Sequence, residues 1–375
     1  MKLIQIIPLT FKLLCISAAI CMIIFWIVEY QRNENITLVE YKSTREIQNI
    51  TCPEISICFD HPFLNNELVK FNPDLDKSRY LEHLKGEEGF NETYNDIPYD
   101  QVTPNLFEHL HRLWIGWKPG RNHSSDECTD SEKCPYFIFR NNYNGMSDFT
   151  FIKCFGIQVN KNYIHDVNWF QLIFDESLGN TLTQIKGVFV MMNQPNQFTR
   201  NMGGVQNIWD PPKGKKRKEH FQITSIDILK RRNKIQSPCM NDWGNYDSLV
   251  LNHHTESVGC RASYHKMYDK YPLCNTQNEL KRAIFDPWSM DSTDFSNPCQ
   301  EMPNIEYKHD FKDTDIDPTV RQTFKIWVAY PKKGKVITES RAVNIHSLIG
   351  NIGGYIGLFL GKSNFIEILF FIQKI

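Results

Sequence analysis

The stretch GGYIGLFLGKS, residues 353–363, decides between two very different folds. A phosphate-binding loop needs the pattern G-x-x-x-x-G-K-[ST] after a buried strand, and the position that must hold its first glycine is Ile356. Only twelve residues follow Ser363, so we expect no room for the helix and sheet of a nucleotide-binding domain. The stretch therefore favours a glycine-rich membrane helix.

The glycines of this segment recur at a spacing of four and are Gly350, Gly353, Gly354, Gly357 and Gly361. At about 100° per residue they fall within roughly 100° of one another on a helix, where they let a second helix approach closely. An anchor that merely dimerises through G-x-x-x-G is one interpretation. The polar residues Asn351, Ser363 and Glu367 favour a pore instead, because intramembrane polar groups usually face protein or water.

The apolar residues of the chain concentrate at its two ends. Residues 11–28 contain Lys12 as their only charge and span roughly 27 Å as a helix, which matches the hydrocarbon core of a bilayer. Residues 348–375 form a second apolar segment of similar length. A cleaved secretory signal is the alternative for the first segment, but no small-residue cleavage site follows Val28.

These segments divide the chain into four parts. We expect a short cytosolic N-terminus (1–10), a transmembrane helix (11–29), an extracellular domain (30–341), and a second transmembrane helix that includes the pore region and has no cytosolic tail after it (342–375). The 375 residues are 41% hydrophobic and carry a formal net charge of −1, which allows a large core and argues against a nucleic-acid partner.

Sequons and cysteines in the middle of the chain are typical of an exported protein. The N-x-[ST] sequons begin at Asn35, Asn49, Asn91 and Asn122, and we expect these asparagines to be glycosylated. The nine cysteines outside the apolar segments are Cys52, Cys58, Cys128, Cys134, Cys154, Cys239, Cys260, Cys274 and Cys299. They include no C-x-x-C pair, so disulfides are favoured over structural zinc, and an odd number leaves at least one cysteine without an intrachain partner.

Runs of β-branched and aromatic residues predict a buried sheet, with strands at 36–41, 54–58, 149–159, 170–174 and 185–192. Residues 323–330 and 335–339 predict a hairpin whose second strand leads into the second apolar segment. A sheet shared by the strands next to the two apolar segments would hold both membrane helices in register. The composition predicts helices at 78–84, 104–114 and 279–285, and a solvated basic loop at 211–218 that precedes the basic run at 230–232.

No catalytic or metal-binding motif accompanies these elements. His109 and His111 lack a third ligand nearby in the sequence, His253 and His254 stand alone, and neither G-x-S-x-G nor H-E-x-x-H occurs. We therefore expect that the protein is not an enzyme and binds no metal.

Several stretches resemble the degenerin/epithelial sodium channel family, which includes the acid-sensing channels. HSLIGNIGGYIGLFLGKSNFIEIL (346–369) resembles the second membrane segment of the family, and CPEISICFD (52–60) resembles its F-P-x-V-x-x-C block after the first. VGCRASYHKMYDKYPLC (258–274) and NPCQEMPNIEYK (297–308) resemble its cysteine-rich thumb region. The matches keep their order along nearly the whole chain, and the glycine-rich block is the most specific.

The resemblance implies a homo- or heterotrimer of two-span subunits in the plasma membrane, with cytosolic termini. Its large disulfide-containing α+β extracellular domain would be hand-like, with palm sheet, β-ball, finger and thumb. The pore would conduct Na⁺, need no cofactor, and be blocked by amiloride-like compounds.

The resemblance also implies roles for individual residues. Gly361, Lys362 and Ser363 match the G-x-S selectivity filter, in which backbone carbonyls replace the hydration shell of sodium. Gly350 matches the gate position, and Glu367 matches a carboxylate on the inner side of the pore. Disulfide partners implied by the resemblance, with pairings left open, are Cys58, Cys260, Cys274 and Cys299.

The sequence departs from the family at several points. The cytosolic His-Gly motif is absent, Asn351 replaces an aspartate near the gate, and Lys362 replaces a small, apolar or aromatic residue. The leading hypothesis is a subunit of a trimeric ligand-, proton- or force-gated sodium-selective channel. The alternative is a non-conducting, membrane-anchored extracellular binding or adhesion protein of the same fold.

Overall fold

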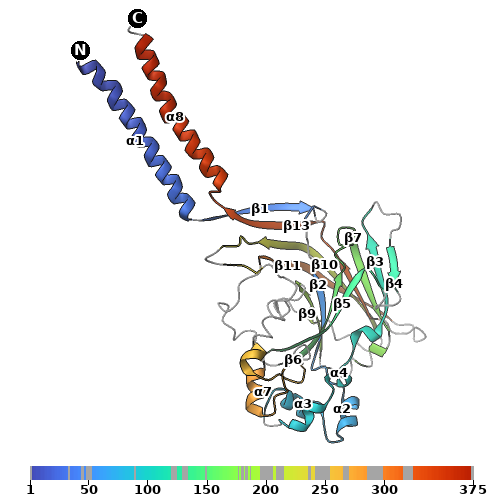
Figure 1. Cartoon of the computed structure of the whole chain (residues 1–375). Helices are drawn as coiled ribbons and strands as arrows, with labels where there is room; N and C mark the ends of the chain where they lie inside the picture. Colours follow the sequence, from blue (N-terminus) through green and yellow to red (C-terminus); the bar gives the residue numbers. More distant parts are fainter. Residues whose placement is uncertain are drawn as a thin grey trace. The chain divides into compact units, whose positions relative to one another are not determined.

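The computed structural model describes residues 2–32, 34–43, 46–47, 53–87, 90–119, 125–128, 134–147, 150–175, 177–178, 181, 185, 187–194, 206–207, 215–234, 238–240, 254–264, 270–284, 299–315 and 324–372. The chain forms two compact units (Figure 1). The first consists of Met1–Val39, Lys230–Arg232 and Ile337–Ile375, and the second of Glu40–Leu229 and Asn233–Val336.

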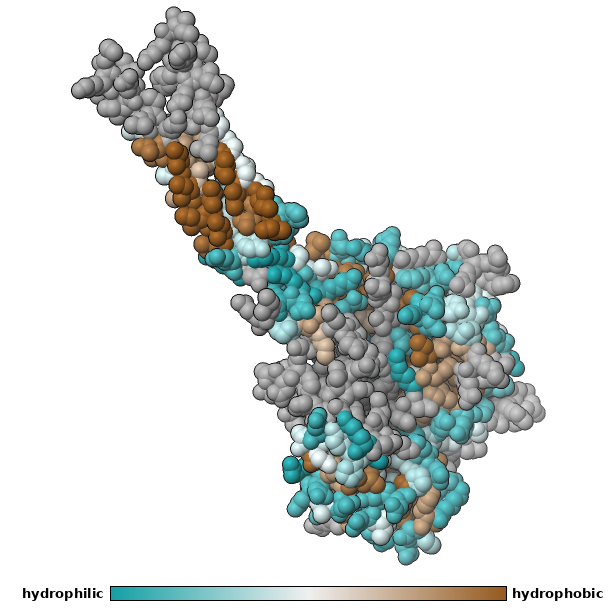
Figure 2. Space-filling view, in the orientation of Figure 1, coloured by the Kyte–Doolittle hydropathy of each residue, from teal (hydrophilic) through white to brown (hydrophobic). Residues whose placement is uncertain are grey.

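The first unit is built on two long helices, α1 (Lys2–Arg32) and α8 (Ile345–Ile372). They lie side by side and run antiparallel, so both chain ends lie at the same end of the pair (Figure 1). Within α1, the segment Leu13–Arg32 is long and apolar enough to cross a membrane, and α8 contains a shorter apolar stretch at Ile345–Phe359. Figure 2 shows hydrophobic residues over the described surface of both helices, which is typical of helices in a bilayer.

Local contacts mark the ends of these helices. Arg32, in the last turn of α1, forms an ion pair of 2.8 Å with Glu29 one turn earlier. Asn344 precedes α8, and its Oδ1 accepts a hydrogen bond of 2.7 Å from the backbone N–H of Ser347, as an N-cap residue does. Both helices therefore end at polar residues on the side of the strands.

Two sheets form most of the second unit. The larger sheet has the order β1 (Asn35–Ser43), β13 (Lys333–Arg341), β10 (Lys215–Lys230), β12 (Phe324–Ala329), β7 (Val167–Phe174), β3 (Leu110–Trp117) and β4 (Ser125–Cys128), with β11 (Gln300–Asp315) also paired to β10. The smaller has the order β5 (Phe137–Ser147), β6 (Thr150–Val159), β2 (Glu54–Asp60), β8 (Gly187–Asn193) and β9 (Gln206–Asn207). Parts of β1 and β13 and the last residue of β10 belong to the first unit.

The main core lies between these two sheets. The rings of Phe137 in β5 and Phe170 in β7 are 5.3 Å apart, and Phe107 packs on Phe155 at 5.5 Å. Strand β2 is buried along its whole length because β6 and β8 pair with its two edges. The buried sheet predicted from the apolar runs is therefore present.

Strand β10 makes the predicted hairpin wrong. It lies between β12 and β13, and it pairs with β12 in parallel, with Lys218 opposite Lys325. Phe221, Ile223, Ile226 and Ile228 supply its buried side, whereas its first residues are basic. The predicted loop at 211–218 is also wrong in part, because residues 215–218 belong to β10. Residues 211–214 lie outside the described part of the chain.

The helix predicted at 104–114 is also wrong. A short 3-10 turn, η2 (Leu106–His109), leads directly into β3. The buried positions of β3 include Leu113, Ile115 and Trp117, which have the spacing of a strand. Gly116 lies against the Trp169 ring, and a Cβ there would overlap it.

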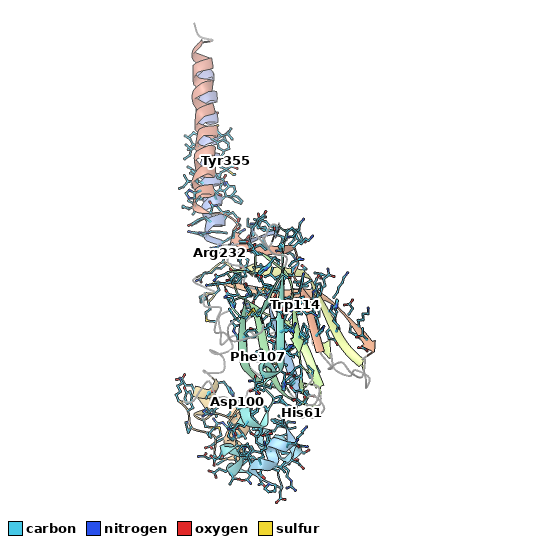
Figure 3. The ribbon with its side chains drawn as sticks, turned by 90° about the vertical axis from the view of Figure 1, so that its right-hand side faces the viewer. His61, Asp100, Phe107, Trp114, Arg232 and Tyr355 are labelled. Atoms are coloured by element: carbon cyan, nitrogen blue, oxygen red, sulfur yellow. A yellow bond between two sulfur atoms is a disulfide. The ribbon has the colours of Figure 1, made fainter. Side chains whose placement is uncertain are left out.

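Short helices gather around a second core in the second unit, whose largest buried side chains are aromatic. They are α2 (Asn65–Phe71), α3 (Lys77–Leu84), η1 (Glu92–Asp96), α4 (Tyr99–Val102) and α7 (Gln277–Ala283), so the helices predicted at 78–84 and 279–285 correspond to α3 and α7. Phe63 contacts Tyr80 and Tyr99 edge to face at 5.3 and 6.3 Å. In Figure 3, Asp100 and His61 mark this helical part, and Phe107 and Trp114 lie by the sheets.

A buried lysine links the two cores. Lys153, in β6, is 3% exposed, and its Nζ donates a hydrogen bond of 2.7 Å to Thr103 Oγ1. The same ammonium lies 5.5 Å from the Tyr99 ring centroid and 5.4 Å from that of Phe155. Hydrogen bonding and cation–π contacts together offset the desolvation of its charge.

Eight of the nine cysteines between the terminal helices form four disulfides, which are Cys58–Cys154, Cys128–Cys134, Cys239–Cys299 and Cys260–Cys274. Cys58 and Cys154 are directly opposite each other on β2 and β6. Cys52 lies outside the described residues, and Cys15 and Cys21 of α1 are free thiols.

Acidification should destabilise the helical part of the second unit through His83. This residue is fully buried between the rings of Tyr80 and Phe90, at 6.0 and 5.2 Å, and its Nδ1 accepts a hydrogen bond from Asn91 N–H. Burial, only partly opposed by a hydrogen bond with Asn95, lowers the pKa of His83 from its ordinary 6.5 to about 4.

The unfolded imidazole takes up a proton near pH 6.5, whereas the folded one does so only near pH 4. Stability is therefore complete above about pH 6.5 and declines by about 3 kcal/mol as the pH falls to 4. Denaturant unfolding followed between pH 4 and 7.5 should show this decline, and His83→Phe should flatten it. The exposed His111→Phe variant is the control; an unchanged pH profile in His83→Phe would contradict the assignment.

Candidate functional site

The two helices of the first unit pack through one face each. On α1 the shielded residues include Cys15, Ala19, Met22, Trp26 and Tyr30, which recur every three or four positions. On α8 the shielded residues are Leu348, Asn351, Ile352, Tyr355 and Phe359. Because α1 is packed along α8, these two series form the contact face of the pair.

The glycine face of α8 points away from α1. We use this name for Gly350, Gly353, Gly354, Gly357 and Gly361, whose mean direction is roughly 160° around the helix from the shielded residues. A Cβ atom built at any of the five would meet no atom within 4 Å. The glycines are therefore not used to bring α8 close to α1, and their face is open in the single chain.

The remaining predicted pore residues belong to the same helix. Asn351 is half-buried at the edge of the face that packs on α1, whereas Gly361 is exposed. Lys362, Ser363 and Glu367 lie within the helical span of α8, but their side chains lie outside the described part of the structure. The backbone of residues 361–363 is thus continuous helix, without a break or loop.

The strands next to α1 and α8 are neighbours in the larger sheet, as the sequence predicted for a sheet that holds both helices. At the start of the β1–β13 pair, the backbone N–H of Ala342 donates to Glu34 O at 2.9 Å. Arg341 Nη2 donates to the backbone carbonyl of Tyr30, and its guanidinium carbon lies 3.5 Å from the centroid of the Tyr30 ring. The last turn of α1 is thereby attached to the segment that leads into α8.

A polar junction completes this attachment, and we call it the Asn35 junction. Asn35 Nδ2 donates to Glu339 Oε2 at 3.3 Å, and Asn35 Oδ1 accepts from Arg232 Nη1 at 3.2 Å. Arg232 N–H donates to the same Glu339 oxygen at 3.4 Å. Three chain segments thus meet where the helices give way to strands, and Figure 3 shows Arg232 at this end of the helix pair, with Tyr355 further along α8.

Little in the sequence indicates the Asn35 junction. Asn35 stands out only as part of a sequon and Arg232 only as part of a basic run. Because the three residues are separated by 107 positions or more, no local pattern connects them. The only signal is that Asn35 precedes one predicted strand and Glu339 ends another, while no strand or apolar segment is predicted next to Arg232.

A serine, a histidine and an aspartate also come together in the second unit. His109 Nδ1 is 2.6 Å from Ser177 Oγ and 3.6 Å from Asp175 Oδ1, while the Ser177 hydroxyl lies 2.6 Å from Asp175 Oδ1. Asp175 Oδ1 also accepts the backbone N–H groups of Ser177 and Leu178, which is the pattern of a turn capped by aspartate. A catalytic triad differs, because its histidine lies between the serine and the acid.

Within the described part of the chain, no three or more His, Cys, Asp or Glu side chains are grouped to hold a metal ion. His111 is exposed, His253 lies outside the described residues, and His254 begins a short helical turn. These histidines therefore offer no alternative to the helix pair as the candidate site.

Comparisons with known proteins do not assign the chain to a family. No protein-family model and no curated protein sequence matches it. Among solved structures it is similar to a proton-activated chloride channel studied by cryo-electron microscopy, at 8% sequence identity and a TM-score of 0.27, over 97% of this chain and 96% of that chain. At this identity and TM-score, the likeness carries no conclusion about this protein.

The Asn35 junction yields a test of stability. Glu339→Ala removes the acceptor shared by the Asn35 amide and the Arg232 N–H, and we expect it to lower the free energy of unfolding by about 1–2 kcal/mol. Glu40→Ala, on the neighbouring strand β1, removes only an exposed ion pair with Lys42 and should change stability by less than about 1 kcal/mol. Denaturant unfolding in detergent measures both variants, and equal losses would contradict a special role for the junction.

Proposed function

We propose that this chain is a subunit of an oligomeric ion channel in which α8 lines the pore. The observation that carries the proposal is the glycine face, which is open on the side of α8 that points away from α1. Glycine lowers the stability of a helix, and small residues at helix contacts in membranes allow close approach of backbones. Five glycines on an unoccupied face are best explained by neighbouring copies of α8.

The proposal extends to a specific channel type. On the resemblance of residues 346–369, we assign the pore to the sodium-selective degenerin/epithelial sodium channel class, as a trimer blocked by amiloride-like compounds. In this proposal Gly361, Lys362 and Ser363 form the filter, Gly350 and Asn351 the gate, and Glu367 an inner carboxylate. The second unit lies outside the plasma membrane, and the stimulus is a ligand, protons or force.

The proposed filter requires a conformational change in α8. In an α-helix each carbonyl accepts a hydrogen bond from the N–H four residues later, so the carbonyls of residues 361–363 are engaged along the helix. Carbonyls that replace the hydration shell of an ion must be free of such bonds. We therefore propose that α8 opens at Gly361–Ser363 in the assembled channel, where glycine makes an opening least costly.

The β1–β13 pair is the proposed route by which a stimulus reaches the pore. Both strands continue without interruption from the first unit into the second. The Asn35 junction and the Arg341–Tyr30 contact attach both helices to these strands. Movement of either strand is thereby coupled to the pore helix.

Electrophysiology separates this proposal from its rival, a membrane-anchored extracellular binding or adhesion protein. Cells that express the chain, alone or with a full-length channel subunit of the same class, should carry a sodium current that amiloride blocks. Surface labelling verifies that the protein reaches the plasma membrane. Surface expression without a new or altered current in either setting would favour the anchored protein.

Cross-linking tests the glycine face directly. In a background with Cys15→Ser and Cys21→Ser, Gly357→Cys places a thiol on the open face, and oxidation in native membranes should yield disulfide-linked subunits. Ile356→Cys is a matched control, because position 356 is also exposed but points about 100° away. Equal cross-linking of the two variants, or none in Gly357→Cys, would contradict self-association through this face.

Lys362 gives a test of the pore lining. A unit charge about 8 Å from the ion opposes it by roughly 2 kcal/mol at an effective dielectric constant of 20. Lys362→Ala should therefore increase the sodium current several-fold per surface-expressed channel, whereas Lys70→Ala, on the exposed surface of α2, should leave it unchanged. Identical currents and selectivity in Lys362→Ala and the parent would place this charge away from the ion path.

A further inference from the structure

Two of the four sequons fall on described residues, and their asparagines differ in exposure and in the hydrogen bonds of their side-chain amides. Asn35 lies in the first unit at the start of β1, and Asn91 lies in the second unit before η1. Asn49 and Asn122 lie outside the described residues. The sequon pattern alone cannot separate Asn35 from Asn91, but their hydrogen bonds do.

Asn91 is exposed and leaves its amide nitrogen available. Its Oδ1 accepts hydrogen bonds from Thr93 N–H at 3.1 Å and from Thr93 Oγ1 at 2.9 Å, while its own backbone N–H donates to His83 Nδ1 at 3.3 Å. Within the described part of the chain, the Asn91 Nδ2 group donates to no other residue. The backbone and the Oδ1 atom therefore hold the side chain, and Nδ2 is free to carry a substituent in solvent.

Asn35 has no such freedom. It is half-buried, and both ends of its amide are used in the Asn35 junction, with Nδ2 donating to Glu339 and Oδ1 accepting from Arg232. It also follows the end of α1 at Arg32 by only three positions. A sugar on Nδ2 replaces one of its two hydrogens and would have to be accommodated beside the Glu339 carboxylate at this half-buried position.

We propose that Asn91 carries an N-linked oligosaccharide in the folded protein and that Asn35 remains unmodified there. The inference rests on the topology of the proposed function, in which both residues lie on the extracellular side. The donor is a polyprenyl-diphosphate-linked oligosaccharide, supplied in the secretory lumen. Nδ2 forms a bond to C1 of the terminal sugar, the bond from C1 to the diphosphate oxygen breaks, the amide loses one proton, and the polyprenyl diphosphate leaves.

The oligosaccharide can be transferred before the chain folds. Folding then explains why Asn91 and Asn35 differ in the mature protein. A chain glycosylated at Asn91 folds with the hydrogen bonds of that residue intact, because none of them uses Nδ2. A chain glycosylated at Asn35 keeps one hydrogen on Nδ2 but must close the Asn35 junction around a bulky sugar at a half-buried position, which disfavours the contacts with Glu339 and Arg232. The mature population therefore consists of molecules with a glycan at Asn91 and a bare Asn35.

Site-resolved mass spectrometry of the full-length protein from eukaryotic cells tests the proposal. Peptide N-glycosidase converts a glycosylated asparagine to aspartate, and heavy-oxygen water labels each converted site. We expect the label at position 91 and unmodified asparagine at position 35. Asn91→Asp keeps an oxygen that caps η1 and should remove one glycan, seen as one fewer step on partial deglycosylation.

Thr37→Ala is the matched control for the first sequon. It abolishes the acceptor pattern but leaves the Asn35 amide and its two partners in place, and the Thr37 side chain is exposed. The number of glycans and the unfolding midpoint should both equal those of the parent protein. A lost glycan in Thr37→Ala, or label at position 35, would overturn the assignment of Asn35.

The remaining outcomes separate this inference from the proposed function. Label at Asn49 or Asn122 with a bare Asn91 would overturn the assignment of Asn91 while leaving the extracellular topology intact. A protein that reaches the cell surface with no label at any of the four sequons would overturn the assignment of Asn91 and count against the proposed orientation as well.

Discussion

The pairing of β1 with β13 is the constraint on which the pair of long helices, α1 and α8, depends. The two long helices belong to opposite ends of the chain, so no short connection keeps them together. Instead, each continues into a strand, and the two strands are neighbours. The same region satisfies the backbone groups that a helix leaves unpaired at its ends: Arg341 binds the Tyr30 carbonyl in the last turn of α1, and Asn344 caps the first turn of α8.

Much of the fold was predictable because its signals are local. An uninterrupted apolar run specifies α1, and dense β-branched runs specify strands such as β2 and β8, which are buried in the smaller sheet. The order of the strands within a sheet, in contrast, is not determined by the sequence of any one segment. The hairpin expected between β12 and β13 fails because β10, which begins with basic residues, lies between them and provides a buried side through Phe221 and Ile223.

In the candidate site, too, local features were predictable from the sequence and long-range contacts were not. Helical spacing alone predicted that the five glycines share a face, but not whether α1 covers that face. In the structure, the shielded residues such as Tyr355 and Phe359 lie on the other side of α8, so α1 does not cover the glycine face. The Asn35 junction was not predictable, because Asn35, Arg232 and Glu339 come from three distant segments whose meeting depends on the strand order.

The place of β13 in the larger sheet also determines the order in which the molecule can be assembled. β13 is the last strand to be synthesised, yet it is an interior strand between β1 and β10. Until residue 341 has emerged from the ribosome, β1 and β10 each present a strand edge that awaits β13, and such edges invite pairing with other chains. Because α8 follows β13 after only a few residues, the strand that completes the sheet and the second long helix are synthesised in close succession. The edge of β1 is therefore without its β13 partner during almost the entire synthesis of the second unit, and that of β10 from residue 230 onward, so the yield of folded protein depends on protecting these edges until β13 arrives.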